Sequence, residues 1–423
     1  MAITVLKGTL VEAVAPDELR ITEGGYLVAE EGTVVGTFAT LPDAYAQADV
    51  TDYGDALLLQ SFSDMHLHAP QYPMMGVGAG EELLDWLEGY TFPTEEAFDD
   101  ADYARTVSRA LAGELIAVGT TRVCMFASIH KEAALVLMEE LERVGITGYV
   151  GKVNMDRNAP AYLCESTEAS VADTVAFLDA CEGRFAHIRP ILTPRFSPAC
   201  TEALMDALGQ LSAARDLPVQ SHLSENRREI AWVKSLYPDS ERYGDTYAKF
   251  GLWHDRTLMA HAVWSDEVEM DALRAAGVYV VHCPSSNTNL RSGIAPVCTM
   301  RDRGIKVVLG SDMAAGSTLS GLDIVREAVQ LSGLREVTNS TSQRHLTLTE
   351  AWYMATSAAG EFFGERPGFA PGNHLGVMVV EDKDLPVPHA LTVTERFARM
   401  FYRRQKGAIR AVYSGEHVHV LTV

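Results

Sequence analysis

The stretch Ser61-Phe62-Ser63-Asp64-Met65-His66-Leu67-His68-Ala69-Pro70-Gln71-Tyr72 decides the fold. It follows the apolar run Ala56-Leu57-Leu58-Leu59, so it has the character of the end of a buried strand. Alternate side chains of a strand share one face, and we therefore expect His66 and His68 to point the same way. Two imidazoles on one face are a candidate pair of metal ligands, although an H-x-H alone is more often two polar barrel residues.

Beyond this stretch, apolar β-branched runs alternate with helical patterns, which is typical of a parallel sheet with crossover helices. The predicted strands are 57–68, 119–126, 148–153, 188–192, 218–222, 257–261, 278–282 and 305–312. Eight strand–helix units are the number that closes a TIM barrel. Polar residues stand near the carboxyl ends of these strands, where such barrels carry out chemistry. We predict an α/β fold built on a TIM (β/α)8 barrel.

The two ends of the chain have a different pattern of apolar residues from the middle. Short apolar runs separated by turns fill residues 1 to about 53 and return near the C-terminus, which predicts strands of a small sheet. We therefore expect a small discontinuous β-sandwich domain built from residues 1–60 and 369–423. The metal-dependent barrel would occupy residues 61–368.

The amino-acid composition and net charge argue against some classes of binding partner. Of the 423 residues, 47% are hydrophobic and 22% charged, as in an ordinary globular enzyme. The formal net charge of -22 argues against nucleic acid or an anionic membrane as a partner, because phosphates would be repelled. No secretory signal, transmembrane run or cysteine spacing typical of disulfides or zinc sites is visible, so we expect a cytoplasmic protein.

Histidines and one acid recur at the carboxyl ends of the predicted strands. They are His66 and His68 on the first strand, His222 on the fifth, His261 on the sixth, His282 on the seventh and Asp312 on the eighth. Each alone is more often a buried polar residue with ordinary partners, but their joint occurrence at one end of a barrel is hard to obtain by accident. Three imidazoles and a carboxylate suit an ion such as Zn²⁺. The fourth strand ends without a lysine to bridge two metals, which favours one metal.

Glu225 follows His222 closely, and two interpretations of it remain open. In a loop beyond a metal ligand, its carboxylate could move protons as a general acid and base. Alternatively it could cap the next helix, because Ser224-Glu225-Asn226 is also a helix-start pattern.

These residues together resemble the amidohydrolase superfamily, which is carried by His66-Leu67-His68, His222, His261 and Gly310-Ser311-Asp312 in this order. His282-Cys283-Pro284-Ser285-Ser286-Asn287 also fits it. Four further stretches are similar to its guanine deaminase family: His66-Leu67-His68-Ala69-Pro70-Gln71-Tyr72, Tyr90-Thr91-Phe92-Pro93, Thr193-Pro194-Arg195-Phe196-Ser197 and Ser221-His222-Leu223-Ser224-Glu225-Asn226. The resemblance covers roughly residues 57–363 and implies one Zn²⁺ per chain, with Fe²⁺ as an alternative, and a homodimer.

The resemblance also implies roles for individual residues. The metal ligands would be His66, His68, His222 and Asp312. Glu225 would shuttle protons, shared with Asp312, and His261 would orient the attacking water or the substrate. Gln71, Arg195 and Phe196 would hold a purine, with the Arg195 guanidinium and the Gln71 amide donating to O6 and N7 of guanine. The implied reaction is hydrolysis of guanine to xanthine and ammonia by a metal-activated water.

Two other functions stay open at this point. A deaminase of a related aminated heterocycle, such as 8-oxoguanine, a pterin or a triazine, would use the same scaffold. An inactive barrel kept as a binding or scaffold protein is a different class of function, and the intact ligand positions argue against it.

Overall fold

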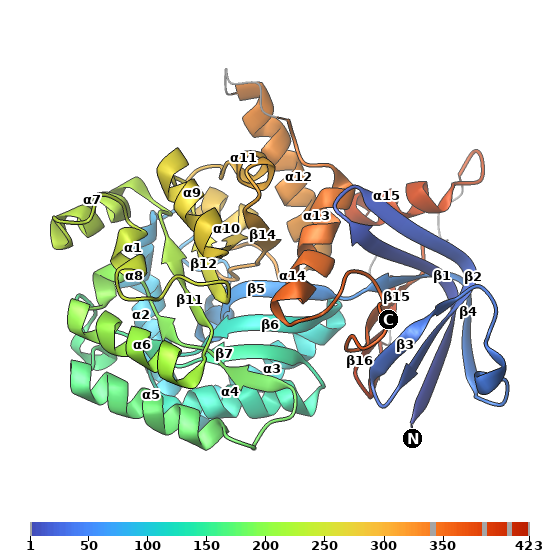
Figure 1. Ribbon diagram of the computed structural model, residues 1–423, viewed down its shortest axis with the longest axis horizontal. Helices are drawn as coiled ribbons and strands as arrows, with labels where there is room; N and C mark the ends of the chain where they lie inside the picture. The colour runs from blue at the N-terminus through green and yellow to red at the C-terminus, as the bar shows by residue number, and fades with distance from the viewer. Residues whose placement is uncertain (1, 339–343, 383–386, 404–407, 422–423) are drawn as a thin grey trace.

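The computed structural model describes residues 2–338, 344–382, 387–403 and 408–421. A ring of strands surrounded by helices takes up one side of the molecule, and a β-rich region takes up the other. Both ends of the chain lie in the β-rich region (Figure 1).

The strands of the ring pair in parallel within two four-stranded sheets. The first contains β5 (Phe62–His68), β6 (Thr120–Phe126), β7 (Thr147–Gly151) and β9 (Ile188–Pro190). The second contains β11 (Val219–Leu223), β12 (Thr257–His261), β13 (Tyr279–His282) and β14 (Lys306–Leu309). A parallel bridge between Leu192 and Val219 joins the two sheets at one seam. At the other seam, the amide of Asp312 donates to the carbonyl of His66 over 2.8 Å.

Hydrogen bonds therefore connect these strands around a ring, and the mixed α/β, TIM-barrel-like architecture expected from the sequence is confirmed. A short pair, β8 (Val153–Asn154) and β10 (Thr193–Pro194), extends the ring at its carboxyl edge. The predicted strands agree with the observed ones to within a few residues, because the apolar runs that define them are the buried cores of the strands.

Helices cover the outside of the ring and supply its connections (Figure 1). They are α1 (Leu83–Trp86), α2 (Phe92–Glu96), α3 (Ala101–Ala117), α4 (Lys131–Arg143), α5 (Thr167–Cys181), α6 (Glu202–Arg215), α7 (Arg227–Leu236), α8 (Asp245–Ala248), α9 (Glu267–Ala276), α10 (Pro284–Asn289), α11 (Val297–Asp302), α12 (Gly321–Thr338), α13 (Leu348–Ala355) and α14 (Ser357–Phe362). In α3, for example, the Asp100 side chain accepts from two backbone amides at the helix start. Ala104, Val107, Leu111 and Leu115 then recur at helical spacing and are buried.

The terminal segments form one seven-stranded sheet with α15 (Val393–Tyr402) beside it. In spatial order its strands are β17 (His417–Val420), β16 (Ile409–Ser414), β15 (Gly376–Val380), β4 (Val50–Gln60), β1 (Ile3–Ala15), β2 (Glu18–Glu30) and β3 (Thr33–Phe38). Strands from both ends of the chain thus share a sheet, while the expected division into a β-sandwich is not confirmed.

One predicted strand, 57–68, is wrong as a single element. Residues 57–60 belong to β4, which pairs with β1 and β15, and β5 starts the ring only at Phe62. Leu58 packs in the core of the terminal sheet, whereas Leu57 and Leu59 pack in the main core of the ring. A strand buried on both faces has the same continuous apolar run as a barrel strand, which explains the error.

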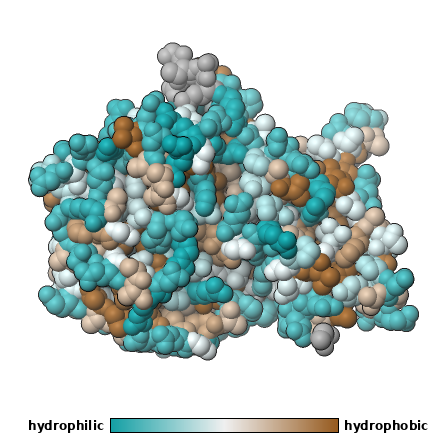
Figure 2. Space-filling model, in the orientation of Figure 1, coloured by the Kyte–Doolittle hydropathy of each residue, from teal (hydrophilic) through white to brown (hydrophobic). Residues whose placement is uncertain are grey.

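None of the helices in the described residues is both long and apolar enough to span a membrane. The face of the molecule drawn in Figure 2 is mostly hydrophilic, with small and separated hydrophobic patches. Such scattered apolar residues are ordinary for a protein surface.

Candidate functional site

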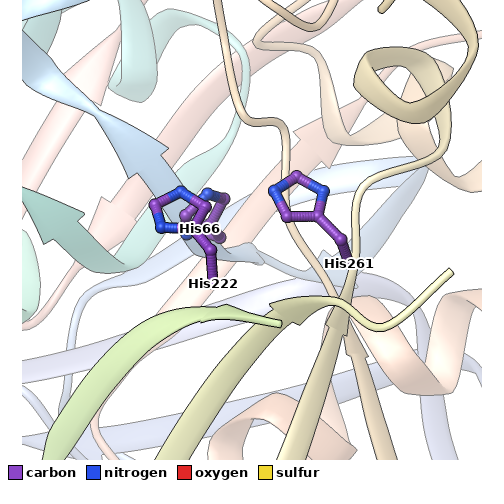
Figure 3. A group of neighbouring side chains, drawn as sticks. All are labelled: His66, His222 and His261. Atoms are coloured by element: carbon purple, nitrogen blue, oxygen red, sulfur yellow. The ribbon is translucent and has the colours of Figure 1, made fainter. Parts of the chain in front are cut away.

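Four histidines and an aspartate converge at the carboxyl end of the ring. The Nε2 atoms of His68 and His222 lie 3.0 Å apart. Oδ1 of Asp312 lies 3.5 Å from Nε2 of His66 and 3.9 Å from Nε2 of His68. Nε2 of His261 lies 3.9 Å from the other Asp312 oxygen. His66, His222 and His261 gather in one place although they come from separate strands (Figure 3).

The backbone around this cluster is unusually constrained. Ser224, His261 and Asp312 follow or end strands with φ of 45°, 75° and 45°, the left-handed region that residues other than glycine rarely adopt. Such strain costs of order 1–3 kcal/mol per residue and collects at functional sites. Gly310 is required for another reason, because a Cβ there would lie 2.9 Å from the Cβ of His66.

Hydrogen bonds set the tautomers of two of the histidines. Nδ1 of His222 lies 2.6 Å from the backbone carbonyl of Arg195, and Nδ1 of His261 lies 2.9 Å from Oδ1 of Asn287. Because an oxygen of this kind can only accept, Nδ1 carries a proton in each ring. In His222, whose pKa is lowered, Nε2 keeps its lone pair, as in metal sites where an outer partner orients the ligand. In His261, the charges of Glu225 and Asp312 outweigh burial and raise the pKa.

Burial controls the charges in the cluster. It lowers the pKa values of His66, His68 and His222, so these rings are neutral near pH 7. Burial alone would raise the pKa of Asp312, but its attraction to His66 and the other nearby imidazoles outweighs burial, and the pKa falls well below its usual range. Neutral imidazoles and an ionised carboxylate are the states that bind a divalent metal.

The donor set fits one such ion. Nε2 of His66 is buried and has no hydrogen-bond partner among the described residues. Around a tetrahedral zinc with Zn–N distances of about 2.0–2.1 Å, ligand atoms lie roughly 3.3 Å apart, close to the separations in the cluster. Among the described residues, His66 belongs to two overlapping groups with metal-ligand spacing, one with His68 and Asp312 and one with His222 and His261.

Glu225 lies beside this cluster and does not cap a helix. The N-cap of α7 is Asn226, which forms a capping box with Glu229, so the cap interpretation of Glu225 is wrong. One Glu225 oxygen lies 3.4 Å from Nε2 of His261, and the other accepts from the Ser292 hydroxyl over 2.8 Å. Burial raises the pKa of Glu225 to about 7, although His261 opposes the shift.

A cavity opens onto these residues, with about 390 Å³ of empty space that includes open solvent at its mouth. Its lining includes the expected Gln71, Arg195 and Phe196 together with His68, His222, Glu225, His261 and Asp312. Leu83, Trp86 and Leu87 cover it from α1 and from the π-helical turn Leu87–Thr91, an element often found at functional sites. The structure therefore brings together every site residue expected from the sequence except the seventh-strand histidine.

His282, the seventh-strand histidine, belongs to neither group of candidate ligands and does not line the cavity. It is buried, and burial lowers its pKa to about 3. Its imidazole is therefore a neutral core residue at the end of β13.

The structure adds a partner to the expected purine-binding residues. The Gln71 amide nitrogen donates one of its two hydrogens to Oε1 of Glu95 over 3.1 Å, which leaves one N–H for a ligand. Glu95 also accepts from the Arg195 guanidinium over 2.5 and 3.0 Å. The sequence contained little to reveal Glu95, the first of two adjacent glutamates just beyond the Tyr90–Pro93 stretch.

Comparison with known protein families shows which family this chain belongs to. Residues 57–378 match the Amidohydrolase family, which is well over half of the chain. This chain belongs to the amidohydrolase family. Guanine deaminase of Dictyostelium discoideum is a 41% identical relative, matched over 73% of this chain and 69% of that protein. Guanine deaminase of Escherichia coli is 34% identical over 87% of this chain and 84% of that protein.

Solved structures agree with this place in the amidohydrolase family. Guanine deaminase from C. acetobutylicum, solved with guanine bound in its active site, is similar at a TM-score of 0.96 and 40% identity, covering 99% of this chain and 100% of that one. A triazine hydrolase from Arthrobacter is 19% identical at a TM-score of 0.87, over 99% of this chain and 95% of that one. The second likeness concerns the fold alone.

Proposed function

We propose that this chain is a metal-dependent aminohydrolase that converts guanine and water to xanthine and ammonia. The observation that carries the proposal is the likeness, over nearly the whole chain, to a guanine deaminase that holds guanine in its active site. The cavity described above adds a chemical reason. It joins a metal-type cluster to a buried acid with a pKa of about 7 and to an arginine that can hold a polar ring edge.

His66, His68, His222 and Asp312 would hold one divalent ion, and zinc is the ion that the three imidazoles favour. When bound, such an ion lowers the pKa of water from 15.7 to about 7 and supplies a nucleophile at neutral pH. Asp312 is held for this task because one of its oxygens accepts from the Ser286 hydroxyl over 2.5 Å.

Glu225 is suited to move the protons of the reaction. Attack of water at C2 of guanine makes a tetrahedral carbon that carries the amine, and the amine leaves only after it has been protonated. A carboxyl with a pKa of about 7 can accept a proton from water and return it to the departing nitrogen. His261, in contact with Glu225 and close to Asp312, would orient the water or the substrate.

Arg195 and Phe196 would hold the purine. A guanidinium has five N–H donors, and the Glu95 carboxylate engages two of them, so others remain for a carbonyl oxygen such as O6. Phe196 lines the same cavity and offers a ring face for stacking.

Ammonia release from a panel of aminated heterocycles tests this function. Guanine should be deaminated in preference to adenine, cytosine and guanosine, because adenine has an amine in place of O6 and guanosine carries a ribose on N9. The proposal fails if metal-loaded protein releases no ammonia from guanine but does so from 8-oxoguanine, a pterin or a triazine.

The domain boundaries, the oligomeric state and the cellular location are part of the same proposal. We divide the chain into a (β/α)8 barrel of residues 61–368 and a β-sandwich domain of residues 1–60 and 369–423. In support, β4 ends at Gln60 and pairs with β15 from the other end of the chain. A homodimer and a cytoplasmic location stay predictions.

A further inference from the structure

We propose that Glu95 is a positioning residue that gives the site its preference for a lactam, a ring N–H next to a ring carbonyl. It would do so by fixing Gln71 with its carbonyl oxygen exposed to the ligand, beside the donors of Arg195. The inference rests on the proposed function in one respect: it takes the ligand of this cavity to be a purine.

The side chains of Glu95, Arg195 and Gln71 form one hydrogen-bonded group at the cavity. Glu95, Arg195 and Gln71 are exposed by only 1%, 2% and 1%. They come from three separate elements: Glu95 from α2, Gln71 from the 3-10 turn Ala69–Met74, and Arg195 from the loop after β10. A buried carboxylate and guanidinium joined by two hydrogen bonds make a strong and directional pair, so Glu95 holds the plane of the Arg195 side chain. The guanidinium also lies 5.2 Å from the centre of the Phe92 ring, which borders the same group.

Glu95 dictates how the Gln71 amide must lie. Both Glu95 oxygens accept from Arg195, so Glu95 is a carboxylate and has no proton to give. Only the NH₂ end of the Gln71 amide can face it, and the 3.1 Å contact is of this kind. The other end, Oε1, is buried and has no partner among the described residues, although Gln71 lines the cavity.

A buried acceptor without a partner indicates what the missing partner should be. Leaving such a group unpaired costs free energy, so a ligand that supplies an N–H there gains affinity. Gln71 and Arg195 both line the cavity, so we take this oxygen as its acceptor and the remaining N–H groups of Arg195 as its donors. Guanine matches this order with N1–H beside O6, whereas adenine presents the reverse order, an N1 acceptor beside an amine donor. Glu95 also offsets the charge of Arg195, which suits a neutral ligand.

Binding of two unreactive purines to metal-loaded protein tests the inference by calorimetry. Hypoxanthine carries the lactam but no amine at C2, and purine carries neither group. Wild-type protein should bind hypoxanthine at least about tenfold more tightly than purine, because each lost hydrogen bond to a buried polar group weakens binding by about that factor. Glu95→Gln should lose most of this ratio, since its amide frees the Gln71 side chain to turn over and leaves Arg195 without a counter-charge.

The matched control is Glu96→Gln, an exposed glutamate next to Glu95 on the same helix, which should keep the wild-type ratio. A folded Glu95→Gln protein that also keeps the ratio overturns the inference. If Glu95→Gln does not fold, Gln71→Leu replaces it: this variant should lose the preference for hypoxanthine, and a ratio that stays at the wild-type value again overturns the inference. Absence of guanine turnover together with the predicted ratios would reject the proposed function and leave this inference standing.

Discussion

Glu225→Gln is the substitution that examines the proposed chemistry most closely. Glutamine keeps the shape of the side chain and can still accept from the Ser292 hydroxyl, which now donates to Glu225 over 2.8 Å. It cannot take up or release a proton at neutral pH. Glu225 is also outside the set of proposed metal ligands, so we expect the fold and the metal content to be unchanged.

The size of the effect follows from the task assigned to Glu225. Loss of a general acid and base slows turnover by about 10²–10⁴-fold, equivalent to about 3–5 kcal/mol of lost transition-state stabilisation. The structure favours the upper half of this range. The Glu225 carboxyl is buried and lies 3.4 Å from His261, and it would both accept and return the proton.

The pH dependence of kcat/KM for guanine supplies a second readout of the same substitution. Glu225 must be a carboxylate to accept the first proton, and burial raises its pKa to about 7, so activity should fall as the pH drops below about 7. Glu225→Gln should abolish this acid limb along with most of the turnover. Ser292→Ala should keep the limb but move it to higher pH, because the hydroxyl stabilises the charged form of the carboxyl.

Steady-state assays of xanthine formation, with metal content and thermal stability measured on the same samples, decide the matter. Wild-type turnover in a folded, metal-loaded Glu225→Gln protein would refute the reasoning. A fall in kcat/KM at low pH that persists in Glu225→Gln would also refute it, because a group other than Glu225 would then be titrating.

The remaining predictions concern substrate, metal and stability. Arg195→Ala should lower kcat/KM for guanine by at least about tenfold, because it removes hydrogen-bond donors to the purine. The metal content should stay unchanged, since the Arg195 backbone carbonyl that holds His222 is retained in alanine. Loss of metal would contradict this expectation. Elemental analysis should give one divalent metal per chain, and a value near two would rule out the single site. Glu140→Gln should cost about 1 kcal/mol of unfolding free energy near pH 7, because hydrogen bonds to exposed arginines lower the pKa of this buried carboxyl from 4.5 to about 2. This contribution is present above pH ~4.5 and disappears toward pH ~2, so denaturation curves of Glu140→Gln and wild-type protein should converge as the pH falls; a constant difference would contradict it.

Much of the fold could be predicted because its signals are local. A buried parallel strand is a short apolar run whatever it packs against, so the runs of the ring were found within a few residues. For the same reason, residues 57–60 are assigned wrongly from the sequence. A strand packed between two cores has the same continuous apolar run as a strand of the ring. Only its pairing with β1 and β15, more than 300 residues apart in one case, assigns it to the terminal sheet.

The candidate site divides in a similar way. His66, His68, His222, His261 and Asp312 could be found because each stands at the end of a recognisable strand, and all such ends meet on one side of a parallel ring. Glu95 and Arg195 are 100 residues apart and meet through loops and a short helix, which no periodic pattern marks. The orientation of the Gln71 amide depends on that contact, so the sequence does not indicate that Glu95 takes up one Gln71 N–H.

The central claim is that a metal held by this cluster makes guanine hydrolysis possible, and metal depletion followed by reconstitution tests it most directly. Xanthine formation from guanine should vanish when the protein is stripped of metal and return when one equivalent of Zn²⁺ is added back, with one ammonia released per xanthine. Fully depleted protein that still forms xanthine at the original rate, or zinc-loaded protein that forms none, would contradict the account.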